Sequence, residues 1–289
     1  MSQFDQAVQT FKSILKDQPN EFSVSLSLVQ TLLSWGSSCI RAGEFSKSID
    51  LLSEALLEAK CLINGKEELS EAWKLIGDAC YLGSIVCVAQ TSELALIATE
   101  ILGINDVELD SLHDGNLSVD NCGYIVNKLL RAHVAAMEKM VQFTEGDRLA
   151  HSAAYFNLGL ARYRLATTQN LETNLASVRP ILECFKLAIY HEPRNFEYWN
   201  ALGVATARHF PSVAEKALSR CLQINERVRY PSVPSHCRTP LLGLILESCT
   251  SSMMTTSSLA LLFRGVRLVI PKMPLRGWDK LSSRFALTI

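Results

Sequence analysis

ILECFKLAIYHEPRNFEYWNALG, residues 181–203, joins two amphipathic helical patterns across a break. Its first half places Ile181, Phe185 and Ala188 at spacings of four and three residues, which is one face of a helix. Pro193 ends that pattern, because proline lacks the backbone N–H that a continuing helix needs. The second half starts a new helical face with Trp199, Leu202 and Gly203. We therefore expect a seam between two helical hairpins in this stretch.

Both halves of the seam recur elsewhere in the chain. The spacing of the first half is repeated near the N-terminus by Ala7, Phe11, Ile14 and Pro19. The pattern of the second half is repeated by Trp73, Ile76 and Gly77, and again by Tyr155, Leu158 and Gly159. An aromatic residue followed by a Leu-Gly pair, then Ala, Phe and Pro, resembles the tetratricopeptide repeat, a helix–turn–helix unit of about 34 residues.

These patterns predict an all-α superhelix of tetratricopeptide hairpins over residues 1–226. We expect about three full hairpins, preceded by a half hairpin whose first helix is missing. Such a hairpin buries its apolar face only against its neighbours, so the half hairpin indicates a fragment or shortened form of a longer array. Helices are predicted at 22–41, 46–59, 71 to about 102, 122–143 and from 150 onward, with an acidic loop or insertion at 103–118.

The last part of the chain, residues 227–289, differs in chemistry from the rest. It carries nine Lys or Arg residues against Glu247 and Asp279, a net charge of +7, so residues 1–226 carry -8. Its prolines and serines follow no helical period. We expect a poorly ordered basic tail, either native or produced by alternative splicing or a wrong reading frame. Cations dispersed among prolines and serines do not predict direct contact with nucleic acid.

The sequence contains no motif that predicts catalysis or a cofactor. Phosphate-binding, dinucleotide-binding, zinc-protease and serine-hydrolase signatures are all missing, so we expect no enzyme activity, no cofactor and no metal site. Nine cysteines form no C-x-x-C pair, and Met1 leads into polar SQFDQ rather than a leader. We expect reduced thiols and a cytoplasmic location, with the nucleus as the other possibility. Neither apolar stretch is uninterrupted enough to span a membrane.

Three segments carry a more specific resemblance. WKLIGDAC at 73–80, YWNALGV at 198–204 and FDQAVQTFKSILKDQPN at 4–20 are similar to the large tetratricopeptide subunit of the superkiller (Ski) complex. The resemblance covers about residues 1–226. It implies a protein-binding scaffold that holds an RNA helicase subunit and β-propeller subunits together and assists 3′-to-5′ decay of messenger RNA by the exosome.

Asn157 supports an alternative function. Tetratricopeptide adaptors of the co-chaperone type hold the C-terminal carboxylate of a partner with an Asn at this place, and Arg162 or Arg164 could assist it here. Lys74, in the preceding first helix, is not in a convincing place to help. The plainer interpretation is a polar residue on a helix surface. Trp73 and Trp199 are interpreted as packing residues rather than ligand contacts.

Overall fold

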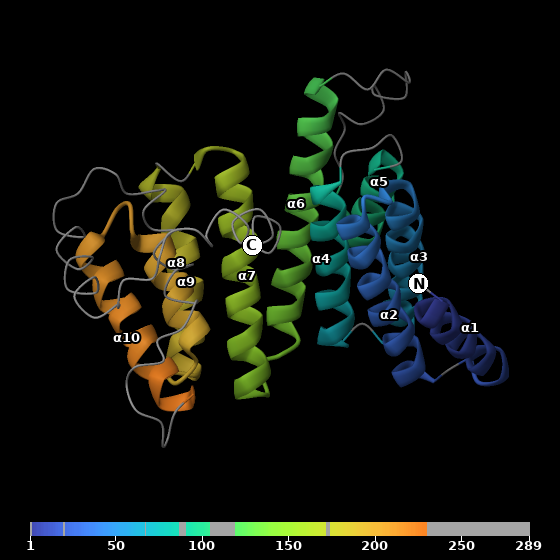
Figure 1. Ribbon diagram of the computed structural model, residues 1–289, viewed down its shortest axis with the longest axis horizontal. Coiled ribbons are helices and arrows are strands. Elements are labelled where there is room, and N and C mark those ends of the chain that lie inside the picture. The colour runs from blue at the N-terminus through green and yellow to red at the C-terminus, as the bar shows by residue number, and fades with distance from the viewer. Residues whose placement is uncertain are drawn as a thin grey trace, which may run out of the picture. The chain divides into compact units, whose positions relative to one another are not determined.

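The computed structural model describes residues 2–19, 21–66, 68–86, 91–104, 119–171 and 174–229 (Figure 1). In these residues the regular elements are ten α-helices, without a strand. They are α1 (Ser2–Asp17), α2 (Phe22–Ala42), α3 (Phe45–Gly65), α4 (Ser70–Ile85), α5 (Thr91–Leu102), α6 (Val119–Gln142), α7 (Arg148–Thr168), α8 (Leu175–His191), α9 (Phe196–Thr206) and α10 (Pro211–Arg229). The all-α prediction is confirmed. The predicted tail lies outside the described residues from 230 onward, so its order stays a prediction.

The chain divides into two compact units, Met1–Glu192 and Pro193–Ile289. The division falls inside the seam at 181–203, where the sequence predicts a break between hairpins. Helices α1 to α8 belong to the first unit, and α9 and α10 belong to the second. The boundary predicted at residue 226, between the repeat array and the basic tail, differs from this division and stays a prediction.

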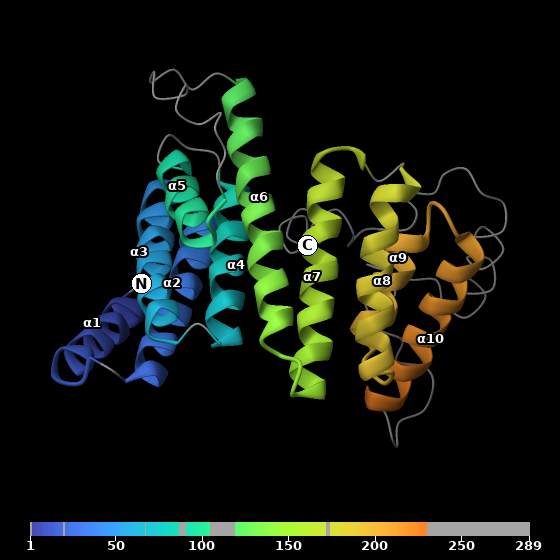
Figure 2. The ribbon, with the colours of Figure 1, turned by 180° about the vertical axis from the view of Figure 1, so that it is seen from behind.

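In the first unit, helices pair as α2 with α3, α4 with α6, and α7 with α8 (Figures 1 and 2). Helix α6 also lies beside α7, and α4 lies beside α3, so successive pairs pack on one another. Helix α1 packs on α2 at the edge of the unit. In the second unit, α9 pairs with α10. The described residues therefore hold four hairpins and two further helices, α1 and α5, rather than about three hairpins and a half hairpin.

The stretch from 71 to about 102 is helical as predicted, but the sequence pattern does not show where its two helices, α4 and α5, are divided. Helix α4 ends at Ile85, and Val86 is extended and buried, with φ -105° and ψ 116°. The Thr91 hydroxyl, in the first turn of α5, donates to the carbonyl oxygen of Val86 at 3.0 Å. Helix α5 is an extra helix that packs against α3 and α6, so the hairpin partner of α4 comes only after residue 118.

Polar residues fix the starts of the later helices. Asn195 caps α9 by accepting a hydrogen bond from the Glu197 N–H at 3.1 Å. Asn174 caps α8 by accepting from the Ala176 N–H at 3.0 Å. Helix α8 thus begins before Pro180, whereas the sequence pattern becomes visible only at Ile181. Val178, before Pro180, is buried on the same face as Ile181, so the apolar face of α8 also begins earlier than the predicted stretch.

A continuous apolar core runs through the first unit, from Val8 on α1 to Cys184 on α8. Val8 is buried, whereas Phe4 and Phe11 are half-buried and pack against the core. The Phe4 ring stacks on Trp35 with 6.3 Å between ring centroids. Helix α1 therefore covers one side of α2 and leaves part of its own apolar face uncovered, as the half hairpin leads one to expect.

Candidate protein-interaction surface

The two helices of each hairpin meet at a glycine. A methyl group built at Gly159 on α7 would lie 2.6 Å from Cε1 of Phe185 on α8, which is closer than two non-bonded carbon atoms approach. At Gly203 on α9 the methyl group would lie 2.7 Å from Leu218 on α10. The backbones of paired helices come this close only because the first helix has no side chain at the contact.

The other two hairpins repeat this contact. A methyl group at Gly77 would collide with Met137, and one at Gly36 would lie 3.3 Å from Leu52. Gly36 follows Trp35 as Gly77 follows Ile76, so α2 carries the same pattern as the other first helices. Gly36 is not among the predicted repeat residues, although Leu32 at the aromatic place and Trp35 at the leucine place mark it in the sequence.

The predicted repeat residues fall into three groups by exposure. The buried ones are Trp73, Ile76, Gly77, Leu158, Gly159, Phe185, Ala188, Leu202 and Gly203. The half-buried ones are Ala7, Phe11, Tyr155 and Trp199. The exposed ones are Ile14, Pro19 and Pro193. Ile14 and Ala188 hold the same place in the spacing, yet Ile14 is 36% exposed because α1 has no paired first helix beside it.

Two of the half-buried aromatic residues make polar or ring contacts at hairpin ends. The Trp199 indole Nε1–H donates to the carbonyl oxygen of Pro193 at 2.9 Å, which closes the turn before α9. The Tyr155 ring stacks parallel to the His191 imidazole, with 6.3 Å between centroids, and meets His151 edge-on at 4.6 Å. Burial and the neighbouring His151 and Arg148 lower the pKa of His191. This cluster joins the start of α7 to the end of α8.

Arg162 stands where the repeat pattern has a tyrosine, and the structure shows why an arginine fits there. Its guanidinium donates to Oε1 of Glu138 on α6 at 2.8 Å and to Sγ of Cys184 on α8 at 3.4 Å. One side chain on α7 thus links the preceding and following helices. Burial raises the pKa of the Cys184 thiol despite the adjacent cation, so the thiol stays protonated at neutral pH.

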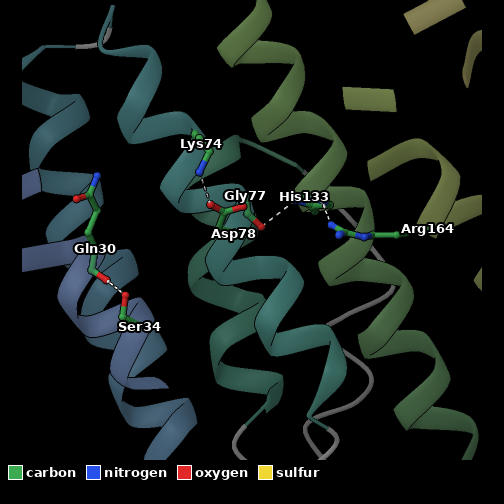
Figure 3. Close-up of polar contacts among 7 residues, drawn as sticks. All are labelled: Gln30, Ser34, Lys74, Gly77, Asp78, His133 and Arg164. Carbon is green, nitrogen blue, oxygen red and sulfur yellow. Dashed lines mark hydrogen bonds and ion pairs between the residues drawn. The ribbon is translucent and has the colours of Figure 1, made fainter. Parts of the chain in front are cut away.

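His133 on α6 is buried and joins three helices (Figure 3). Its Nδ1–H donates to the carbonyl oxygen of Gly77 on α4 at 2.8 Å, since a carbonyl can only accept. The Nε2 lone pair therefore faces Arg164 on α7, whose Nη1 lies 3.4 Å away. Burial, helped by Arg164 and opposed by the Gly77 hydrogen bond, lowers the pKa of His133 to about 4. The imidazole is neutral at neutral pH.

Arg164 also lies over a ring from the preceding hairpin. Its guanidinium carbon is 3.6 Å from the centroid of Tyr81 on α4, a stacked cation–π contact. Tyr81 in turn packs against His133, with 5.6 Å between ring centroids. Arg164 was predicted only as a possible assistant of Asn157, and neither Tyr81 nor His133 was among the predicted site residues.

Figure 3 also shows polar side chains on the first helices α2 and α4. On α4, Lys74 and Asp78 form an ion pair at 2.9 Å, one helical turn apart. On α2, the Ser34 hydroxyl donates to the backbone carbonyl of Gln30 at 2.8 Å, and both residues are exposed. Gln30 and Ser34 are thus exposed polar residues on α2, whereas Lys74 and Asp78 on α4 are half-buried and paired with each other.

Asn157 is half-buried on α7, and its side chain has no hydrogen-bond partner among the described residues. Arg162 points to Glu138 and Cys184, so it is engaged elsewhere and does not assist Asn157. Lys74 is paired with Asp78. Of the cations that the sequence suggested, this leaves Arg164 without a carboxylate partner.

The described residues contain no group of three or more His, Cys, Asp or Glu side chains that could hold a metal ion. None of the helices in this part of the chain is both long and apolar enough to cross a bilayer. Free thiols are found at Cys39, Cys61, Cys80, Cys184 and Cys221. Cys122 is disulfide-bonded, which corrects the expectation that all cysteines are reduced.

Comparison with known proteins supports the resemblance seen in the sequence. No family model matches the chain. Superkiller protein 3 of Schizosaccharomyces pombe is 22% identical over 214 residues, and superkiller complex protein 3 of Homo sapiens is 23% identical over 209 residues. The resemblance to superkiller protein 3 is confirmed. Each alignment covers 71% of this chain, but the chain spans only 15% and 12% of those proteins.

Solved structures give a more distant comparison. A MamA protein superposes with a TM-score of 0.46 at 15% identity, covering 81% of this chain and 90% of MamA. BtubC from P. vanneervenii gives 0.43 at 15% identity, covering 82% of this chain and 94% of BtubC. Scores this low do not support a comparison of binding sites. The chain's own hairpins and glycine contacts make it a tetratricopeptide-type array, which is a scaffold architecture for protein interaction.

Proposed function

We propose that this chain is a non-catalytic protein-binding scaffold and acts within a superkiller-type complex that assists 3′-to-5′ decay of messenger RNA by the exosome. The observation that carries this proposal is the similarity to superkiller protein 3 from two distant organisms over the same share of the chain. The proposed partners are an RNA helicase subunit and β-propeller subunits, with the exosome reached through them.

The arrangement of the hairpins supports binding as the role. The second helix of each pair seals the core against the glycine of the first helix, as Phe185 does at Gly159. The first helices are left to present side chains such as Gln30 and Lys74 to a partner. His133 is buried and contacts α4 through one ring nitrogen and Arg164 on α7 through the other, which is a structural use of histidine.

Affinity purification of the tagged full chain from its host cells tests the proposal. We expect the helicase and β-propeller subunits among the co-purifying proteins, as identified by mass spectrometry. The control is Leu52→Asp, which places a charge at a fully buried contact with Gly36 and unfolds the first hairpin. Absence of both kinds of subunit from the wild-type sample would overturn the proposal, whatever else co-purifies.

One observation favours a second candidate, an adaptor of the co-chaperone type that binds a C-terminal carboxylate. Asn157 and Arg164 lie two helical turns apart on α7, and neither has a carboxylate partner. The Asp78 carboxylate on α4 counts against it, because a like charge repels a bound carboxylate. Titration with an acidic peptide that has a free C-terminus distinguishes the scaffold from the adaptor. Equal affinity of wild type and Asn157→Ala for this peptide would remove the adaptor as a candidate.

A further inference from the structure

Several half-buried cations in the described residues have a carboxylate beside them: Lys60 pairs with Glu100, Lys74 with Asp78 and Arg162 with Glu138. Arg164 is also half-buried, but its contacts are to a neutral imidazole and a phenol ring. An anion beside a partly buried cation offsets part of the free energy that its burial costs, so a carboxylate from a partner would be favourable here.

Arg164 is also held in one orientation. Tyr81 covers one face of the guanidinium, and the Nε2 lone pair of His133 accepts from Nη1. His133 is fixed by its own hydrogen bond to Gly77, which the missing side chain at residue 77 makes possible. The remaining N–H donors of Arg164 keep the planar fork that matches the two oxygens of a carboxylate. A side chain already fixed loses little entropy when it binds.

The charge of the helix agrees with an acidic ligand. The α7 sequence RLAHSAAYFNLGLARYRLATT contains Arg148, Arg162 and Arg164 but no acidic residue. On α6, which packs against α7, the Glu138 carboxylate is compensated by Arg162. On α4 the Asp78 carboxylate is compensated by Lys74. A partner with carboxylates therefore meets one uncompensated, oriented cation at this place.

We propose that Arg164 is a binding residue for an acidic side chain in a segment of a partner protein, and that Tyr81 and His133 are the positioning residues that orient it. This inference rests on the scaffold role proposed above and names the chemistry of one partner segment. The recognised group is an Asp or Glu side chain within a chain, not a terminal carboxylate.

The test uses the purified full chain and hexaglutamate blocked at both ends, so that the probe has no terminal carboxylate. The readout is the Nε–H resonance of the Arg164 side chain, assigned from its loss in Arg164→Gln, together with the affinity from the same titration. We expect this resonance to shift on titration and Arg164→Gln to weaken binding by about tenfold. Arg164→Lys keeps the charge but not the planar fork of N–H donors, so its affinity for hexaglutamate should lie between those of wild type and Arg164→Gln.

Arg179→Gln is the matched control, because it removes the same charge from an exposed position on α8. We expect it to bind hexaglutamate as the wild type does. The positioning role is tested by Tyr81→Leu, which should weaken binding about threefold while Arg164 is intact. If Arg164→Gln does not fold, two results test the inference instead: the shift of the Arg164 resonance in wild type and the loss of affinity for hexaglutamate in Arg164→Lys.

Several outcomes would overturn the inference. These are no shift of the Arg164 resonance, equal weakening by Arg164→Gln and Arg179→Gln, or an Arg164-dependent shift with oligouridylate but not with hexaglutamate. A lower thermal midpoint in Arg164→Gln with unchanged binding would show a purely structural role. None of these results depends on the helicase or β-propeller subunits, so failure here is separable from failure of the complex-level proposal.

Discussion

Gly159 shows how the lack of one methyl group sets the distance between two helices. Phe185 fills the space that a Cβ would take, with three ring atoms within 3.1 Å of that position. Both residues are buried, and an aromatic ring in a close-packed core cannot rotate away without displacing its neighbours. The spacing of α7 and α8 therefore depends on this glycine.

We predict that Gly159→Ala lowers the free energy of unfolding by about 1–3 kcal/mol, because the added carbon overpacks the contact with Phe185. Gly123→Ala on α6 is the matched control: it meets no atom within 4 Å and should raise stability by about 0.5–1 kcal/mol, since alanine favours the helix. Urea denaturation followed by circular dichroism measures both. Equal effects of the two changes would contradict the close contact.

His133 makes stability depend on pH. Its pKa is about 4 in the folded chain against an ordinary 6.5, so the unfolded chain binds the proton more strongly between these values. We predict that lowering the pH from about 7 to about 5 removes roughly 2 kcal/mol of stability through this residue. In His133→Asn the free energy of unfolding, measured by urea denaturation, should fall less with pH over the same range. A variant slope equal to that of wild type would show that His133 does not carry the effect.

The repeat residues could be predicted from the sequence, whereas the cluster around His133 could not. Trp73, Ile76 and Gly77 follow one another along a helix, so their spacing is visible in the chain. His133 bonds to Gly77 across 56 positions and meets Arg164 across 31. No local period marks such contacts, because they depend on which helices become neighbours.

At the scale of elements, α5 is the departure from a simple hairpin array. Apolar residues continue from α4 into α5 without a proline or glycine, so the sequence pattern shows no break there. The break exists because α5 packs against α3 and α6, and this requires the chain to turn after Ile85. Tertiary packing overrides the local signal at this point. By contrast, the seam at Pro193 was predictable because proline and the Asn195 cap mark it in the sequence.

We predict that α5 is an integral part of the core of the first unit. Leu94 on α5 is fully buried and lies against Gly83, so Leu94→Ala should lower the free energy of unfolding by about 2–4 kcal/mol. Leu96→Ala, on the same helix but 40% exposed, should cost less than about 1 kcal/mol. Thermal and urea denaturation compare the two variants. A small effect of both would mean that α5 is a loosely attached insertion.

At the scale of the whole molecule, the first unit holds its own core. The apolar cluster from Val8 to Cys184 lies wholly within Met1–Glu192. Repeat arrays gain stability from each hairpin and from the interface with the next, so a block of several hairpins can fold without the rest. The three hairpins of this unit provide such interfaces through the contacts of α3 with α4 and of α6 with α7.

We predict that residues 1–192, expressed alone, fold with high helical content and unfold cooperatively. Far-ultraviolet circular dichroism and a urea titration of this segment measure both properties. Leu52→Asp within the same segment is the control, and it should abolish the cooperative transition by placing a charge in the core. A gradual, non-cooperative transition of the unaltered segment would show that its core is not self-sufficient.

The insertion between α4 and α6 also affects the order in which the chain folds during synthesis. Gly77 leaves the ribosome 56 residues before His133, its hydrogen-bond partner on α6. At translation rates of about 5–20 residues per second, that separation is roughly 3 to 11 seconds. Until α6 emerges, the apolar face that Ile76 and Gly77 present has only the preceding hairpin and α5 to cover it. During this interval the nascent chain exposes apolar surface that favours aggregation and that a chaperone can cover.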